Sequence, residues 1–178
     1  MDYAGVFIEG HGGKLLFQMR DHTPGIPYPN QWSLFGGGIK HNETPRHAAA
    51  RELQEELHIN IHPTVLLPLV TIPTFVNTNY IFYLRLTMPL SGLRLCEGYS
   101  MESFDAWQLL FKNHVALPLR LLLAIYPLLR ALQKVSYQQS QLCFDRNMQR
   151  LKHHPGLFTS ALCVRHCGEE GCAESGLS

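Results

Sequence analysis

Short, mostly apolar runs separated by turn residues predict β-strands along this chain. The first two runs flank the turn His11-Gly12-Gly13 and therefore predict a β-hairpin. Pro68 lies inside a later run and places that strand at a sheet edge, or breaks it there. The predicted strands cover residues 3–9, 14–19, 32–35, 64–72 and 78–87.

Three other segments have apolar residues three and four positions apart, which is the spacing of helices. The first helix is expected to begin after Thr44, a good N-cap, with Pro45 in its first turn and no breaker before Leu57. A short helix is expected over residues 105–112. A long apolar helix is expected over residues 117–135, with a proline as a candidate kink. Two helices on opposite faces of one sheet give an α+β sandwich.

Composition limits the kinds of partner. The 178 residues are 46% hydrophobic and 16% charged, so the chain is long and apolar enough for one globular core. A net charge of +1 gives no electrostatic case for nucleic acid or a membrane surface as the main partner. No apolar run is long enough to span a bilayer, and Asp2 stands where a secretory signal would be basic. Five cysteines, an odd number, do not resemble a disulfide framework, so we expect a cytoplasmic protein.

The candidate chemistry lies on the first predicted helix. Glu52, Glu55 and Glu56 fall at i, i+3 and i+4 and therefore point from one helix face. Such carboxylates repel one another and should raise one another's pKa, unless a cation lies between them. Hard oxygen ligands favour Mg²⁺ or Mn²⁺, ions that commonly accompany phosphates. The glycines at 36–38 let the backbone approach a ligand closely.

The stretch from Gly37 to Ile59 resembles the Nudix box, G-x5-E-x7-R-E-U-x-E-E-x-G-U, in which U is an apolar residue. Glu43 and Arg51 occupy fixed positions of this motif, as do the three glutamates of the helix. The one departure is His58, where the family has glycine, which affects the helix end rather than the carboxylates. The resemblance covers about three quarters of the chain, and the box is its specific part.

The resemblance implies a Nudix-type α/β/α sandwich with a mixed central sheet. It also implies a hydrolase that cleaves a nucleoside diphosphate linked to another moiety, with water attacking phosphorus. Glu52, Glu55 and Glu56 would hold Mg²⁺ or Mn²⁺, and Glu52 would help to deprotonate the water. Arg51 would orient the carboxylates, and Glu43 would bind an outer metal or brace the loop.

The substrate is expected to be a small nucleoside triphosphate, with oxidised nucleotides, ADP-ribose and nucleotide sugars as alternatives. A non-hydrolytic Nudix sensor that binds a nucleotide or ADP-ribose is the main rival. Retention of all the box glutamates favours an enzyme over that rival. An isomerase on the same fold, acting on an isoprenoid diphosphate, would need chemistry for which Cys96 is the only local hint. A homodimer is left open, because many relatives are dimers.

Other site residues are carried over from the family. Arg20 is a candidate phosphate contact, and Gly37 and Gly38 are candidate substrate contacts. Trp32 lines a base pocket or packs in the core, with packing favoured. An acid in the expected loop at residues 89–105 should be a further metal ligand or general base. Glu97, which precedes a glycine, is chosen, with Glu102 in reserve.

We predict a Nudix domain over residues 1–135 and a C-terminal tail over residues 136–178. The tail has room for one helix and is otherwise expected to be disordered. Four of its side chains suggest zinc, although their spacing fits none of the usual pairs. They are Cys163, His166, Cys167 and Cys172.

Overall fold

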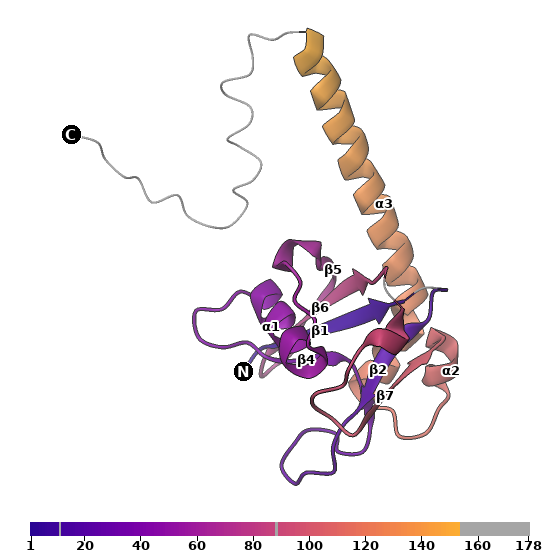
Figure 1. Ribbon diagram of the computed structural model, residues 1–178. Helices are drawn as coiled ribbons and strands as arrows, with labels where there is room; N and C mark the ends of the chain where they lie inside the picture. The colour runs from indigo at the N-terminus through magenta and orange to yellow at the C-terminus, as the bar shows by residue number, and fades with distance from the viewer. Residues whose placement is uncertain (11, 88, 154–178) are drawn as a thin grey trace, which may run out of the picture. The chain divides into compact units, whose positions relative to one another are not determined.

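The computed structural model describes residues 1–10, 12–87 and 89–153 (Figure 1). The chain divides after Gln133 into two units, and the sheet and the candidate site belong to the first. The strands are β1 Tyr3–Glu9, β2 Leu15–Met19, β3 Trp32–Ser33, β4 Phe35–Gly38, β5 Leu67–Pro73, β6 Thr78–Arg85 and β7 Ser100–Phe104. The helices are α1 Pro45–Leu57, α2 Ala106–Leu110 and α3 Leu117–His153, with short 3-10 turns at Pro63–Val65 and Leu90–Gly92.

The described strands form one mixed sheet in the order β3-β2-β1-β6-β5, with β4 paired to β1 and β7 paired to β2. The β1 and β6 strands run parallel, and the other pairs are antiparallel. The predicted hairpin is present, with Ile8 opposite Leu16. The strand that contains Pro68 lies at the sheet edge, and its register shifts just after this proline, as expected for a residue without an N–H.

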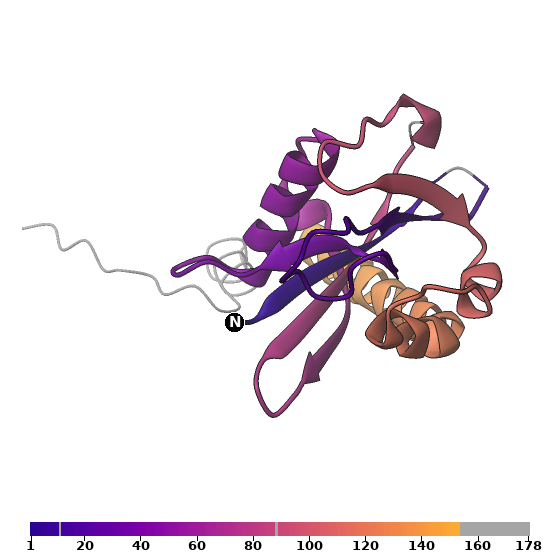
Figure 2. The same cartoon turned by 90° about the horizontal axis from the view of Figure 1, so that it is seen from below.

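Helices α1 and α3 lie on opposite faces of the sheet, which confirms the predicted sandwich (Figures 1 and 2). An apolar layer lies on each face. On one face, Leu53 and Leu57 of α1 pack with the even-numbered residues of β1. On the other face, Leu122 and Leu123 of α3 pack with Phe7 of the same strand. Because side chains alternate along a strand, β1 supplies both layers at once.

The ends of α1 follow from local chemistry. Thr44 is extended and accepts a hydrogen bond from the His47 N–H, and Pro45 occupies the first turn. The helix ends at His58, which adopts φ 58° and ψ 26° and donates its N–H to the Gln54 carbonyl. This left-handed conformation is the one for which the family uses glycine. The substituted histidine therefore ends the helix in the same way, at a cost in backbone strain.

The structure differs from the sequence-based expectation at more than one place. The strand expected at residues 32–35 is divided into β3, which pairs with β2, and β4, which pairs with β1 and includes the glycines. Residues 89–105, expected to be a loop, contain β7, whose Met101 pairs with Gln18 on β2. The segment pairs with the free edge of β2. Such pairing depends on tertiary contacts, which the sequence of a short segment rich in serine and glutamate does not reveal. Helix α3 runs through Pro127 and past the expected end at residue 135. The tail cysteines and His166 lie outside the described residues, and the domain boundary at residue 135 stays a prediction.

None of the described helices combines the length and the hydropathy that crossing a bilayer requires.

Replacing His58 with glycine should stabilise the domain. The change releases about 1–2 kcal/mol of left-handed strain and stabilises the unfolded chain by roughly 0.5–1 kcal/mol. We therefore expect the free energy of unfolding in urea to rise by about 0.5–1 kcal/mol. His41→Gly is the matched control, because His41 is exposed and is not a positive-φ residue. It should lower the same quantity, and a shift of both variants in one direction would refute the assignment of strain to His58.

Candidate active site

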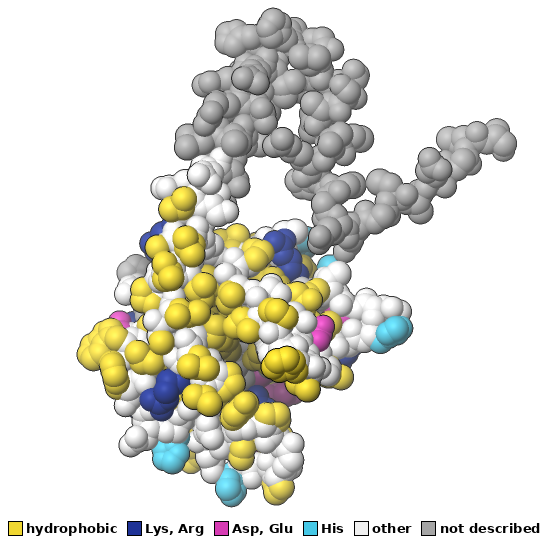
Figure 3. All heavy atoms as spheres, turned by 180° about the vertical axis from the view of Figure 1, so that it is seen from behind, with side chains coloured by type: hydrophobic (Ala, Val, Ile, Leu, Met, Phe, Trp, Pro, Cys, Tyr) yellow, Lys and Arg dark blue, Asp and Glu magenta, His cyan; other side chains and the backbone are white. Residues whose placement is uncertain are grey.

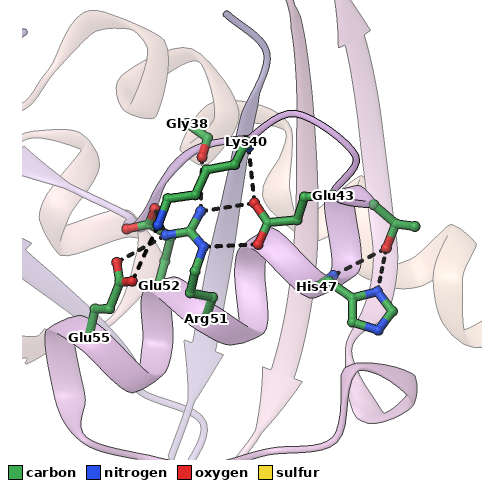
Figure 4. Close-up of polar contacts among 8 residues, drawn as sticks. Gly38, Lys40, Glu43, His47, Arg51, Glu52 and Glu55 are labelled. Carbon is green, nitrogen blue, oxygen red and sulfur yellow. Dashed lines mark hydrogen bonds and ion pairs between the residues drawn. The ribbon is translucent and has the colours of Figure 1, made fainter.

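Arg51 is the centre of the polar network between α1 and the loop that precedes it (Figure 4). Its Nε and Nη2 donate to the two oxygens of Glu43 at 2.9 and 3.0 Å. Its Nη1 donates to Glu52 Oε1 at 2.6 Å and to Glu55 Oε2 at 2.9 Å. The Nη2 atom also reaches the Gly38 carbonyl oxygen at 3.0 Å. One guanidinium therefore gathers three carboxylates and the loop that precedes the helix.

Glu43 is fixed from both sides by this arrangement. Its Oε2 also accepts the Lys40 backbone N–H at 3.0 Å. The hydrogen bonds from Arg51 hold the pKa of Glu43 below its ordinary value, so this carboxylate stays charged. Both oxygens of Glu43 are thus engaged between the loop and α1.

Glu56 lies deeper than the other acids and is 5% exposed. Its Oε2 accepts the Gly36 N–H at 2.8 Å, and its Oε1 accepts Gln18 Nε2 at 2.6 Å. Burial raises the pKa of Glu56 to about 7, although the two hydrogen bonds act in the opposite direction. Repulsion from Glu52 contributes less than burial. A buried carboxylate with both oxygens directed by donors is a preorganised ligand for a cation.

The glycines before α1 are needed for close approach. Gly36 has φ +135°, and a Cβ there would lie 2.1 Å from the Ala4 carbonyl oxygen. A Cβ on Gly37 would lie 2.3 Å from Glu52 Oε1. Only glycine therefore lets β4 pack against β1 and lets the Glu52 carboxylate lie over the strand. Gly38 supplies its carbonyl to Arg51, so its role in this structure is to hold the network.

Arg20 follows β2 on the side of the sheet that faces α1. Its charge lowers the pKa of Glu56, which places the two side chains in one electrostatic environment. Its Nε is buried and has no hydrogen-bond partner among the described residues. Arg20 as a whole is half-buried, so part of its side chain is open to solvent. Its role as a phosphate contact stays a prediction.

Two backbone hydrogen bonds bring the loop that carries Glu97 to the same end of α1. The Cys96 N–H donates to the Glu56 carbonyl at 2.8 Å, and the Tyr99 N–H donates to the Met19 carbonyl at 2.9 Å. Glu97 is exposed between these two anchors. Glu102 of β7 is instead paired directly with Phe17 of β2. Both residues lie on the sheet face that packs against α3. The geometry favours Glu97 over Glu102 as the extra acid.

Trp32 is placed in the core and not in the site. Its side chain is 5% exposed and meets the Phe104 ring edge to face, with the ring centroids 5.0 Å apart. Little of the indole surface is left for a nucleobase. This burial corrects the assignment of Trp32 as a substrate contact and agrees with the packing alternative.

Gln18 is the site residue that sequence reasoning missed. It is 2% exposed, and its Nε2 also donates to the Leu34 carbonyl at 3.1 Å. A polar residue inside the apolar run LLFQM was a usable signal, because a buried amide requires partners. The signal did not identify Glu56 as the partner, because the sequence does not show that this strand lies beside the helix.

The donor set suits a hard divalent cation. Glu52, Glu55 and Glu56 supply carboxylate oxygens, and Glu52 Oε2 accepts no hydrogen bond from the described residues. Within the described part of the chain, however, no group of three acids, histidines or cysteines converges as a metal cluster. Glu52 and Glu55 share Arg51 Nη1 instead. Binding of a cation would therefore require these two carboxylates to share their oxygens with it.

The fold and the carboxylate helix together define a class of protein. A model of the NUDIX domain matches residues 1–122. The chain therefore belongs to the Nudix family. Among solved structures it is similar to the MutT protein from Methanosarcina mazei Go1, with a TM-score of 0.57 and 16% identity, covering 71% of this chain and 92% of that one. At this identity the likeness concerns the fold alone.

Two relatives are similar in sequence. An 8-oxo-dGTP diphosphatase of Proteus vulgaris is 36% identical over 69 residues, which are 38% of this chain and 57% of that protein. The nucleoside triphosphatase NudI of Enterobacter sp. (strain 638) is 38% identical over 61 residues, which are 34% of this chain and 42% of that protein. The matches thus cover about half the length of each relative.

The raised pKa of Glu56 makes stability depend on pH in the metal-free protein. Between the ordinary carboxyl value of 4.5 and about 7, the folded state keeps a proton that the unfolded state has lost. The free energy of unfolding should therefore fall as pH rises through this window, by on the order of 3 kcal/mol, and then level off. Urea unfolding in EDTA at pH 5 and pH 8 measures this difference.

Glu56→Gln should remove most of this pH dependence. Glu55→Gln is the matched control, because Glu55 is an exposed carboxylate one residue away on the same helix. It should retain the wild-type difference between pH 5 and pH 8. An equal loss in both variants would show that burial of Glu56 is not the cause.

Proposed function

We propose that this chain is a divalent-metal-dependent hydrolase of a nucleoside diphosphate linked to another moiety. The observation that carries the proposal is the set of carboxylates on α1, held by Arg51 on one side and by Gln18 and Gly36 on the other. This arrangement keeps repelling acids together at one end of a rigid helix, where a polyphosphate and its cation can be received.

The proposed roles follow from the contacts. Glu52, Glu55 and Glu56 would hold Mg²⁺ or Mn²⁺, and a bound ion would neutralise diphosphate charge and acidify water. Glu52, with a free oxygen, is the proposed base for the attacking water, and Glu97 is the alternative. Arg51 positions the carboxylates and does not contact substrate. The guanidinium of Arg20 is the proposed contact for a phosphate oxygen.

A nucleoside triphosphate is the proposed substrate class. The two relatives act, by name, on 8-oxo-dGTP and on nucleoside triphosphates. Each matches over about half its length, so the choice of base is left to experiment. A Nudix sensor that binds nucleotide without cleaving it is the competing function, and it predicts binding without turnover.

Hydrolysis of a panel of nucleotides, with Mg²⁺ and with Mn²⁺, tests the proposal. We expect turnover of canonical or oxidised nucleoside triphosphates above that of ADP-ribose, sugar nucleotides and dinucleoside polyphosphates. Chelation with EDTA should abolish the activity. Glu56→Gln should lower kcat by about 100-fold or more and leave the protein folded by circular dichroism, because it removes a charged metal ligand.

Two matched variants locate the extra acid. Glu97→Gln should lower kcat, whereas Glu102→Gln, on the opposite sheet face, should leave it near the wild-type value. Metal-dependent binding of a nucleotide without any turnover would replace the hydrolase by the sensor. Wild-type turnover in Glu56→Gln would remove Glu56 from the metal site.

Arg20→Lys tests the phosphate contact. Lysine keeps the positive charge and loses the buried planar donor, so KM should rise several-fold with a smaller change in kcat. Arg94→Lys is the control, because Arg94 is exposed and follows the short 3-10 turn at Leu90–Gly92. An unchanged KM in Arg20→Lys would show that this side chain does not bind substrate.

A further inference from the structure

The outward surface of α3 between residues 117 and 132 is apolar throughout. Figure 3 shows hydrophobic side chains gathered along this helix. The largest of them form what we name the outer stripe, and Leu121 and Leu128 are 62% and 61% exposed. The outer stripe consists of Leu117, Leu121, Ile125, Leu128 and Leu132. The structure describes every residue of this segment. Its other exposed residues are Pro118, Ala124, Pro127 and Ala131.

The two cations of this segment turn away from the stripe. Arg120 donates to the carbonyl oxygens of Leu110 and Lys112 at 2.6 and 2.9 Å. Arg130 lies 3.3 Å from the centroid of the Tyr83 ring, and its Nη2 is 3.8 Å from Glu9 Oε2. Both guanidiniums therefore hold the helix to the domain. No charge remains on the outer surface of residues 117–132, and depletion of charge is the compositional mark of an interface centre.

The outer stripe is separate from the residues that α3 uses for its own core. Leu119, Leu122, Leu123 and Tyr126 face the sheet and are 2–8% exposed. The stripe residues follow one another at intervals of three and four, which lines them along one side of the helix. A helix that is apolar on both sides is normally covered on both sides. The sheet covers one side only.

A second copy of α3 is the occupant that this surface fits best. An interfacial helix on a membrane flanks its apolar face with Lys and Arg, and residues 117–132 expose neither. A surface without charge has no electrostatic complementarity with which to select a charged partner protein. It is self-complementary, because Ala124 and Ala131 leave room beside the larger leucines for the leucines of a facing helix.

The stripe is long enough for a second helix to pack along it. The stripe runs for about 22 Å at 1.5 Å per residue. Trp107 and Phe111 are 64% and 79% exposed, and Arg120 ties the chain on both sides of Phe111 to α3. Aromatic side chains bury about 150–250 Å² each. A stable interface buries roughly 800 Å² per partner, so these aromatic residues would have to join the stripe in the contact.

We propose that the outer stripe is a homodimer interface, in which α3 of a second copy packs antiparallel across residues 117–132. A twofold axis near Ile125 then places Leu121 of one copy beside Leu128 of the other. The proposal concerns the face of the sheet opposite the candidate active site and does not depend on the proposed hydrolysis.

Sedimentation equilibrium of the full-length protein tests the interface. The wild type should sediment as a dimer at micromolar concentration. The double variant Leu121→Lys/Leu128→Lys should weaken association at least tenfold, because each copy then places two cations in the contact. Phe75→Lys is the matched control, because Phe75 is an exposed apolar residue of the β5–β6 turn. It should sediment as the wild type does.

Charge complementation tests the antiparallel pairing. Leu121→Glu/Leu128→Glu should be monomeric alone and should form a heterodimer with the double lysine variant. Circular dichroism verifies that each variant is folded. The wild-type concentration series tests dimerisation without relying on any variant. A monomeric wild type at 100-fold higher concentration, undiminished association of the double lysine variant, or wild-type monomer captured by anionic phospholipid vesicles would overturn the proposal.

Discussion

Repulsion among the acids of α1 is the constraint on which the site depends, and Arg51 is the group that offsets it. Glu43, Glu52 and Glu55 all accept hydrogen bonds from this one guanidinium. Its planar fork reaches two directions at once, which a lysine ammonium does not do with fixed geometry. The same side chain holds the Gly38 carbonyl. Charge balance and the path of the loop are therefore set by a single residue.

Glu56 obeys a different constraint, because protein atoms and not a counter-charge surround it. Its two oxygens are directed by a backbone N–H and a side-chain amide. Neutral donors orient a carboxylate without cancelling its charge, so the cost of burial appears as a raised pKa. A cation bound beside α1 would stabilise the charged carboxylate and so offset the cost of burying it. The buried acid thus favours occupancy of the site more than the exposed Glu55 does.

The parts of the structure that were predictable are those fixed by local chemistry. Thr44, Pro45 and the spacing of the glutamates determine α1, and the turn before Lys14 determines the first hairpin. What could not be read were effects of neighbours distant in sequence. Strand β7 exists because β2 has a free edge, and burial raises the pKa of Glu56 beside Gln18, a hydrogen-bond partner 38 residues away. A tryptophan at position 32 looks the same in the sequence whether it packs in the core or binds a base. The ring contact with Phe104 shows that Trp32 packs in the core.

The two long helices show how one sheet can serve two separate surfaces. Each helix packs an apolar side against β1, and they differ in what they present outward. On α1 the glutamates lie on another side, beside the preceding loop, and Arg51 holds them together. On residues 117–132 of α3, Arg120 and Arg130 turn to the end of α2 and to Glu9, so the outward side of this segment is left apolar. Because the sheet separates them, selection can alter association through α3 while the carboxylate geometry on α1 is preserved.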